Sequence, residues 1–268
     1  MSHRHRIEDG SKFKLSHVDP DDTGKFDSKD EAEAELKKDL QKLAALQETL
    51  FVDKRYALLS VLQAMDTGGK DGTIKHVFSG VNPQSCHVTS FKKPNEEEES
   101  HDFLWRISKA LPERGELGIF NRSHYEDVLI VRVHNLVEKS IWKKRYDAIN
   151  DFEQRLYNEG TVILKFFLYI SKDEQLKRIQ ARVDDPQKRW KFTENDLKER
   201  KYWNDYIEAY EEAVRRCSTP WAPWYVVPSN KKWYRNYVVA NALVKTLEDL
   251  HLKLPKITLD PKLVRNLK

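Results

Sequence analysis

A glycine-rich turn between an apolar run and a segment with helical spacing constrains this chain more than any other feature. Residues 56–64 are rich in Leu and Val, and residues 74–78 resume with apolar side chains at helical spacing. Between them stands the sequence Met65-Asp66-Thr67-Gly68-Gly69-Lys70-Asp71-Gly72-Thr73. A strand, a phosphate-binding loop and a helix in this order form a P-loop. The turn therefore predicts an α/β fold that binds phosphate at this point.

The residue types in the turn suit phosphate chemistry. Glycines let backbone N–H groups approach a phosphate closely, the helix N-terminus adds partial positive charge, and Lys70 adds a full charge. The usual pattern is G-x-x-x-x-G-K-[ST], but Ala64 replaces its first glycine and Asp71 replaces the hydroxyl residue that normally binds Mg²⁺. We expect Asp66 or Thr73 to take over part of that role. The alternative is an ordinary Gly-Gly turn with Lys70 in solvent.

Composition excludes several classes of protein. The chain has 268 residues, 34% of them charged, and a formal net charge of +4. This mild excess is below that of a dedicated nucleic-acid coat, so we expect no specific nucleic-acid partner. Cys86 and Cys217 lie far apart in the sequence, which argues against a disulfide framework or a zinc site. No apolar run approaches the ~18 residues of a membrane span, and the first residues lack a signal-peptide core, so we expect a cytoplasmic protein with no membrane partner.

Short apolar runs alternate with helical patterns along the chain. We expect strands at 56–64, 87–91, 117–120, 161–170 and 224–227. Helices are expected at 28–51, 74–78, 96–111, 128–133, 139–158, 172–185, 193–214 and 232–252. This alternation predicts a parallel sheet with helices on both faces, a three-layer α/β/α sandwich. We divide the chain into a surface arm at 1–27, one domain at 28–255 and a C-terminal tail at 256–268.

Polar residues that follow the third expected strand are candidates for the site, because ligands of such folds lie at the carboxyl ends of the strands. Asn121, Arg122, Glu126 and Asp127 come directly after residues 117–120. Arg122 could take a phosphate bidentately, and the two acids could hold a metal ion or the polar edge of a nucleotide. In the alternative interpretation, Arg122 pairs with one of these acids to anchor the turn.

Basic residues follow the fourth expected strand. Arg178 and Arg182 are four residues apart, so they share one face of a helix. We interpret the segment at about 176–205 as a lid that brings positive charge to phosphates, although a solvated charged face would show the same pattern. The aromatic residues at 221–235 are interpreted as core packing rather than as a stacking surface. Asn230 and Lys232 are the polar exceptions in that stretch.

Four motifs together resemble the second polyphosphate kinase family. They are Ala64-Met65-Asp66-Thr67-Gly68-Gly69-Lys70-Asp71-Gly72-Thr73, Phe120-Asn121-Arg122-Ser123-His124-Tyr125-Glu126-Asp127-Val128, Lys188-Arg189-Trp190-Lys191-Phe192 and Trp224-Tyr225-Val226-Val227-Pro228-Ser229-Asn230-Lys231-Lys232-Trp233. They are similar to that family's Walker A loop, Walker B region, lid and C-terminal signature, in this order. Many members carry Tyr-Asn-Arg where this chain has Tyr125-Glu126-Asp127. The Glu-Asp version is similar to class III, which accepts nucleoside monophosphates as well as diphosphates.

The resemblance implies a P-loop phosphotransferase, related in fold to thymidylate kinase, that uses Mg²⁺ or Mn²⁺. Its partners would be inorganic polyphosphate and nucleoside mono- and diphosphates, and a homo-oligomer (dimer or tetramer) is expected. The expected catalytic residues are Asp66, Lys70, Arg122, Arg178 and Arg182. Asp66 and Glu126 are the expected metal ligands. The expected substrate-binding residues are Thr67, Gly68, Gly69, Asp71, Gly72, Thr73, Lys75, Asn121, Asp127, Lys188, Arg189 and Lys191.

Two alternatives to a polyphosphate-dependent nucleotide kinase remain open at this point. The first is an ATP-dependent nucleoside monophosphate kinase, which would use the same loop with a different donor. The second is a non-catalytic protein that binds polyphosphate or RNA. The Asp66/Lys70 pair favours an enzyme, because binding a polyanion requires no carboxylate in the phosphate loop.

Overall fold

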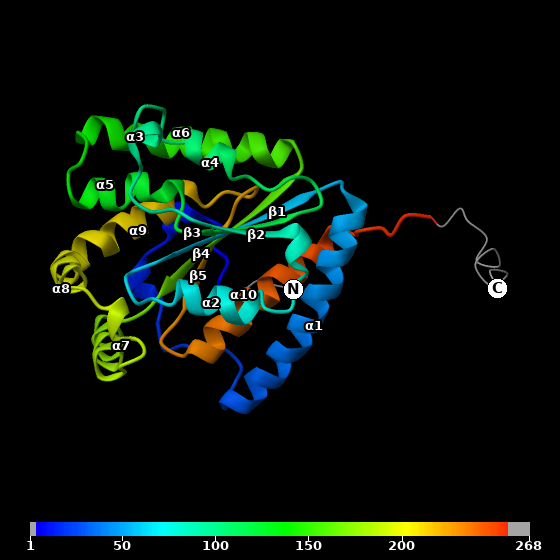
Figure 1. The fold of residues 1–268 in the computed structure, drawn as a ribbon, viewed down its shortest axis with the longest axis horizontal. Helices are drawn as coiled ribbons and strands as arrows, with labels where there is room; N and C mark the ends of the chain where they lie inside the picture. Colours follow the sequence, from blue (N-terminus) through cyan, green and yellow to red (C-terminus); the bar gives the residue numbers. More distant parts are fainter. Residues whose placement is uncertain (1–3, 257–268) are drawn as a thin grey trace.

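Five parallel strands form the centre of the molecule (Figure 1). The structure is a computed structural model, and it describes residues 4–256, without the side chain of Lys191. The strands are β1 (Ala57–Ala64), β2 (Cys86–Ser90), β3 (Leu117–Asn121), β4 (Thr161–Tyr169) and β5 (Trp224–Pro228), in the order β2-β3-β1-β4-β5. Every neighbouring pair is parallel. Each predicted strand is confirmed to within one residue at either end.

Helices cover both faces of this sheet, so the predicted three-layer sandwich is confirmed. One face carries α1 (Lys29–Asp53), α2 (Lys70–Val77) and α10 (Lys232–Asp249) (Figure 1). The other face carries α4 (Trp105–Lys109), α6 (Lys139–Asn158) and α9 (Trp203–Cys217). No helix of the described residues is long and apolar enough to cross a membrane.

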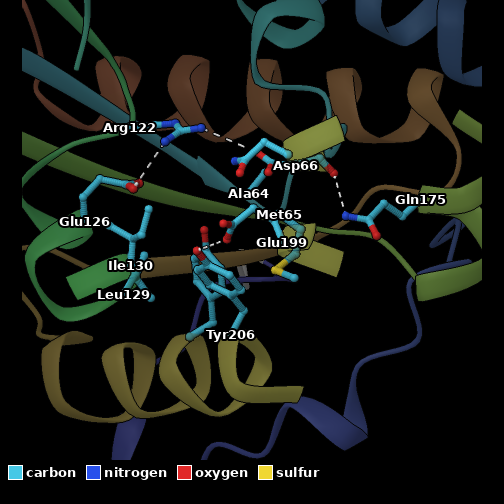
Figure 2. Close-up of a pocket in the computed structure, with 12 residues that line it drawn as sticks. Ala64, Met65, Asp66, Arg122, Glu126, Leu129, Ile130, Gln175, Glu199 and Tyr206 are labelled. Carbon is cyan, nitrogen blue, oxygen red and sulfur yellow. Dashed lines mark hydrogen bonds and ion pairs between the residues drawn. The ribbon is translucent and has the colours of Figure 1, made fainter. Parts of the chain in front are cut away.

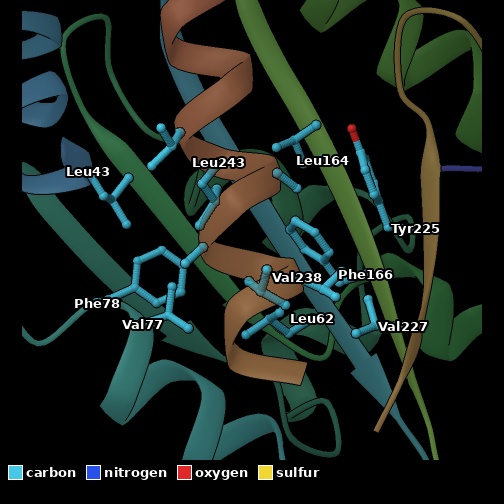
Figure 3. Packing of buried hydrophobic residues seen from close by; sticks show 14 of the residues in the cluster. Leu43, Leu62, Val77, Phe78, Leu164, Phe166, Tyr225, Val227, Val238 and Leu243 are labelled. Atoms are coloured by element: carbon cyan, nitrogen blue, oxygen red, sulfur yellow. The ribbon is translucent and has the colours of Figure 1, made fainter. Parts of the chain in front are cut away.

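Alternation of side chains along β1 divides the core between the two faces. Leu58 and Leu62 belong to the cluster under α1 and α10, whereas Leu59 and Val61 belong to a cluster on the opposite face. All eight residues of β1 are buried, as expected for a central parallel strand. Figure 3 shows α10 lying over the first cluster, where Val238 faces the strands.

Local capping explains where two of the helices begin. The Ser28 side chain accepts a hydrogen bond from the Glu31 N–H at the start of α1, and Ser171 caps α7 (Lys172–Asp184) in the same way through the Glu174 N–H. Both caps satisfy amides that have no partner inside the helix. Gly160 follows α6 with a φ of 92°, a conformation that glycine adopts without strain.

Three of the predicted helices are shorter or interrupted. The helix expected at 96–111 is divided into α3 (Glu96–Glu99) and α4, because the Asp102 carboxylate binds the Leu104 N–H and starts a new turn. The helix expected from 193 consists of α8 (Glu194–Glu199), the 3₁₀ turn η6 (Arg200–Tyr202) and α9. Arg200 fixes this break by donating to the Lys172 carbonyl and to Gln175. Residues 124–133 form η4 (His124–Val128) and α5 (Ile130–Val133).

The N-terminal arm differs from the surface segment that we expected. The Ile7 N–H donates to the Trp224 carbonyl, and the Val226 N–H donates to the His5 carbonyl, so the arm lies along the edge of β5. An edge strand presents unpaired backbone groups, and the arm satisfies some of them. Phe13 and Leu15 are buried with α9. The arm therefore contributes Phe13 and Leu15 to the core, while most of its other described residues are exposed or half-buried. Residues 257–268 of the predicted tail lie outside the described part of the chain.

Candidate active site

The P-loop joins the carboxyl end of β1 to the N-terminus of α2. Its turn is closed by a hydrogen bond from the Gly68 N–H to the Met65 carbonyl, at 2.9 Å. Thr67 and Gly69 have positive φ values of 63° and 107°. A Cβ atom on Gly68 would lie 2.5 Å from the Cβ of Ala64, so the turn has no room for a side chain there. The loop backbone is thus packed tightly around a fixed shape.

Lys70 points back over this loop. Its Nζ donates to the Ala64 carbonyl at 3.1 Å, and the side chain is half-buried. Burial and then the nearby Arg122 lower the pKa of Lys70, against the opposing effect of Asp66 and Glu126. An anion bound beside Lys70 would remove this disadvantage of the charged form.

The missing loop hydroxyl is not replaced by Thr73. The Thr73 hydroxyl is fully buried and donates to the Gly69 carbonyl at 3.1 Å, so it closes the first turn of α2 instead of facing a ligand. Asp71 is exposed and accepts a hydrogen bond from Asn121 Nδ2 at 3.0 Å. Asp66 therefore remains as the loop residue that could hold a metal ion.

Arg122 lies between two carboxylates at the carboxyl end of β3, as Figure 2 shows. Its Nη2 is 3.5 Å from Asp66 Oδ1, and its Nη1 is 3.6 Å from Glu126 Oε2. Arg122 has a φ of 63°, a strained conformation for a residue with a side chain, of the kind that clusters at functional sites. These three residues and the P-loop meet in one place, as predicted.

A cavity of about 110 Å³ opens at this point. Its lining combines the charged side chains of Asp66, Arg122 and Glu126 with apolar and aromatic ones, such as Ile130 and Tyr206 (Figure 2). The lining residues are Ala64, Met65, Asp66, Arg122, Glu126, Leu129, Ile130, Gln175, Asn195, Glu199, Tyr206 and Tyr210. Charged groups together with apolar and aromatic side chains in one cavity suit a ligand that joins phosphate to an aromatic base.

The segment around α8 closes one side of the cavity. Glu199 accepts hydrogen bonds from Tyr206 Oη at 2.8 Å and binds His134 Nε2 at 2.9 Å. Gln175 Nε2 donates to the Asp66 carbonyl at 3.1 Å, and Arg200 donates to Gln175 in turn. This chain of contacts joins the P-loop to the predicted lid. No spacing in the sequence predicts it, because its members come from separate segments: α7, α8, η6, α9 and the residue after α5.

Arg178 differs from the lid arginine that we expected. Its side chain is 8% exposed and is held by Glu174 at 2.7 Å. The guanidinium group donates to four backbone carbonyls, those of Thr67, Gly68, Ser229 and Asn230. Arg178 therefore ties the P-loop to the end of β5 because turn carbonyls in the interior need donors. Its neighbour on the helix face, Arg182, is half-buried and makes no hydrogen bond or ion pair within the described part of the chain.

Asp127, Lys188 and Arg189, three of the expected substrate-binding residues, also have partners within the protein. Asp127 Oδ1 accepts from Arg145 Nη1 at 2.8 Å, which ties it to α6, and burial raises the pKa of Asp127. Lys188 pairs with Asp185, and Arg189 donates to the Val183 carbonyl. Lys75 is exposed on α2. The side chain of Lys191 lies outside the described residues.

Sequence reasoning missed Arg235, which lies beside the P-loop. A Cβ atom on Gly69 would lie 1.9 Å from Arg235 Nη1, so the glycine makes room for this arginine. Arg235 stands within the aromatic stretch that was interpreted as core, and much of that stretch is core, because Trp224, Tyr225 and Tyr234 are buried. Only the packing of α10 against α2 brings the arginine to the loop.

Comparisons with known proteins identify the family of this chain. A model of the family described as Polyphosphate kinase 2 matches residues 26–255. The AMP/ADP-polyphosphate phosphotransferase of Meiothermus ruber is 53% identical over 254 residues, which cover 94% of this chain and 95% of that protein. The ADP-polyphosphate phosphotransferase of Rhodopseudomonas palustris is 45% identical, with 94% and 92% covered. The crystal structure of Polyphosphate Kinase 2 from Arthrobacter aurescens TC1 superposes with a TM-score of 0.95 at 48% identity, covering 98% of this chain and 94% of that one.

Proposed function

The chain belongs to the polyphosphate kinase 2 family, and from this premise we propose that it transfers the terminal phosphoryl group of inorganic polyphosphate to nucleoside diphosphates and monophosphates. The observation that carries the proposal is that Asp66, Arg122 and Glu126 line one cavity. Lys70 lies beside them, bonded to the carbonyl of the lining residue Ala64. The names of the two similar phosphotransferases support polyphosphate as the donor and AMP or ADP as the acceptor.

The reaction requires positive charge rather than a strong base. The attacking group is an oxygen of the acceptor phosphate, which is already anionic at neutral pH. It forms a bond to the terminal phosphorus of polyphosphate, the bridging P–O bond breaks, and the polyphosphate leaves one unit shorter. The difficulty lies in bringing two polyanions together, and cations and backbone amides overcome it. Lys70 and the amides of the P-loop would bind the transferred group, and Arg122 would hold the acceptor phosphate.

Asp66 and Glu126 would hold the metal ion. Mg²⁺ is usually bound by one or two carboxylates together with substrate phosphates, so two carboxylates that line one cavity fit the ion. No group of three metal-binding side chains occurs in the described part of the chain, and the phosphates would supply the remaining ligands. Mg²⁺ or Mn²⁺ at this position would neutralise charge that develops on the phosphate oxygens. Arg122 is 3.5 Å or more from each carboxylate, so their oxygens are not tightly bound to it.

We place the acceptor nucleoside against the apolar wall formed by Leu129, Ile130, Tyr206 and Tyr210. Pockets for drug-sized ligands hold roughly 300 Å³ or more, whereas this cavity holds about 110 Å³. A nucleotide would therefore enter when the part of the lid at 194–205 moves outward, which is its proposed role. The contacts of Glu199 with His134 and Tyr206 would break and re-form in each cycle.

A panel of donors and acceptors tests the function directly. The protein is mixed with Mg²⁺, with long-chain polyphosphate or ATP as donor, and with AMP, ADP, GMP or GDP as acceptor. We expect ADP and ATP to form from AMP and ADP with polyphosphate. Turnover with ATP as donor, and none with polyphosphate, would show that the protein is an ATP-dependent nucleoside monophosphate kinase. Salt-sensitive polyphosphate binding without turnover would select the polyanion-binding protein.

A further inference from the structure

Arg235 is a buried cation without an anionic partner. Its side chain is 2% exposed, and its Nε and Nη2 both donate to the amide oxygen of Asn236, at 3.2 and 2.8 Å. Within residues 4–256 it forms no ion pair, and its Nη1 donates no hydrogen bond. Nη1 is nevertheless not enclosed by protein. A buried arginine costs free energy unless a carboxylate, carbonyls or a bound anion compensate its charge.

Other cations lie close to Arg235, and their repulsion adds to the free-energy cost of burying its charge without an anion. A Cβ atom on Gly69 would lie 1.9 Å from Arg235 Nη1 and 3.6 Å from Arg178 Nη1, so both guanidinium groups lie at this glycine. Lys232 stands one turn earlier on α10, and burial, Arg178 and Arg235 lower its pKa. Glu174, a carboxylate whose charge acts on Lys232, is bound to Arg178. Burial and Arg178 also lower the pKa of Arg235, to about 9.

A purely structural role accounts for Arg178 but not for Arg235. Arg178 donates to four backbone carbonyls and to one carboxylate, so its hydrogen-bonding capacity is used. Arg235 has five N–H groups and a single neutral acceptor oxygen. Its position beside the first turn of α2 adds the free amides of a helix N-terminus to the same place. Together these features form a site for an anion.

The site lies on the donor side of the loop. Arg235 belongs to α10, on the face of the sheet that carries α1 and α2, whereas the acceptor cavity is lined by α5 and α9 on the opposite face. Phosphoryl transfer requires the attacking and leaving oxygens to lie in line across the transferred group. A donor that extends toward Arg235 and an acceptor in the cavity would approach the P-loop from the two faces of the sheet, as this requirement demands.

We propose that Arg235, assisted by Lys232, binds the second phosphate of the polyphosphate donor, next to the terminal phosphate in the P-loop. This inference rests on the proposed function. Gly69 is then required both for the turn and for the room that Arg235 occupies. The single oxygen that bridges the second and the terminal phosphate leaves with the second phosphate, so the guanidinium would also stabilise the negative charge that develops on it as the P–O bond breaks.

The test compares Arg235→Met with Arg235→Lys and with a matched control, Arg55→Met. Arg55 is a surface arginine next to β1's amino end, where it pairs with Asp53. We expect Arg235→Met to raise the KM for polyphosphate by about 10- to 100-fold, because the variant loses a charge-assisted hydrogen bond to the donor. The KM for ADP should stay within about twofold of the wild-type value. Arg235→Lys should lie between, and Arg55→Met should match the wild type. An unchanged KM for polyphosphate in a folded Arg235→Met variant would overturn the proposal.

Thermal unfolding separates this role from a structural one. In the absence of polyphosphate, Arg235→Met should be as stable as the wild type or more stable, because an uncompensated charge is removed. Polyphosphate without nucleotide or metal should raise the Tm of the wild type and fail to raise that of the variant. A variant that is less stable when free, yet keeps its full rise with polyphosphate, would show that Arg235 holds the fold.

Two further arms fix the place of the contact and separate it from the function itself. The affinity of Arg235→Met for tripolyphosphate and its affinity for long-chain polyphosphate should fall by the same factor relative to the wild type, because both ligands have a second phosphate. A loss confined to long chains would overturn this placement. If the wild type formed no ATP from polyphosphate, the proposed function would fail. The Tm comparison would still decide whether Arg235 binds polyphosphate.

Discussion

Two buried cations, Lys165 on β4 and Arg235 on α10, have opposite surroundings. Lys165 is fully buried, and its Nζ contacts Glu153 at 2.5 Å, Cys217 O at 2.6 Å and Tyr125 Oη at 2.8 Å. Three acceptors match the three N–H groups of an ammonium ion. Arg235 has one amide oxygen for five N–H groups. A cation whose hydrogen bonds are complete stabilises the fold, whereas one whose bonds are incomplete is available to a ligand.

The complete network also positions the active site. His124 Nε2 and Tyr125 Oη both bind Glu153 Oε1, at 3.1 and 3.0 Å. These two residues stand between Arg122 and Glu126 in the sequence, so the buried carboxylate of Glu153 anchors the segment that carries both. Because β4 and α6 supply Lys165 and Glu153, the network fixes the end of β3 to the centre of the sheet.

Lys165→Met should cause the largest loss of stability. Removing one partner leaves Glu153 as an uncompensated buried charge, which costs about 3–5 kcal/mol. The double variant Lys165→Met/Glu153→Gln should recover a large part of this loss, because no charge remains unpaired. Urea denaturation measures both variants. If the single variant lost less than about 1 kcal/mol, Lys165 would not differ from a surface lysine, and the comparison with Arg235 would fail.

Lys70→Met should have the opposite effect to Lys165→Met: turnover should fall, and the stability of the fold should change little. Loss of one preorganised cation at the transferred phosphoryl group lowers kcat by about 100- to 1,000-fold. Stability should change by less than about 1 kcal/mol, because burial disfavours the Lys70 charge in the free protein. Steady-state kinetics with polyphosphate and ADP, together with urea denaturation, give both quantities. A variant that retained wild-type kcat would remove Lys70 from the mechanism.

The sequence is sufficient to predict features that depend on neighbours along the chain. β1 and β4 are continuous apolar runs, so their burial in a parallel sheet follows from composition. The P-loop follows from glycines at fixed offsets, and Arg122 and Glu126 follow from their place just after a strand. All of these lie at the carboxyl edge of the sheet, as predicted.

Features that depend on distant partners are not visible in the sequence. The i, i+4 spacing of Arg178 and Arg182 predicts that they share a helix face. It does not show that Arg178 lies within hydrogen-bonding distance of the carbonyls of Thr67 and Ser229. Likewise, no pattern in the sequence shows that α10 places Arg235 beside Gly69. The arm has polar composition, yet its residues 5–7 lie along β5, which sheet order makes an edge strand.

Acid should weaken the Lys165 network and leave the Arg235 site unaffected. Burial opposes ionisation of Glu153, but Lys165 and His124 outweigh it and lower the pKa of Glu153 below its ordinary value of 4.5. A depressed carboxylate pKa contributes stability that is present above pH 4.5 and is lost as the pH falls through the folded pKa. Between pH 7 and 3, the double variant Lys165→Met/Glu153→Gln should therefore lose less stability than the wild type. Equal pH slopes would exclude Glu153 as a source of acid sensitivity.

Asp127→Asn should have the smallest effect. The carboxylate of Asp127 is held by Arg145, and both side chains are largely buried, at 16% and 17% exposure. The amide keeps one acceptor oxygen for Arg145, so we expect a loss of about 1 kcal/mol in stability. The KM values for AMP and ADP should stay within about twofold of the wild type, because the carboxylate binds α6 rather than a ligand. A rise of tenfold or more in the KM for AMP alone, without loss of stability, would return Asp127 to the acceptor site. Asp127 would then belong, with Glu126, to the residues that bind substrate and not to those that stabilise the fold.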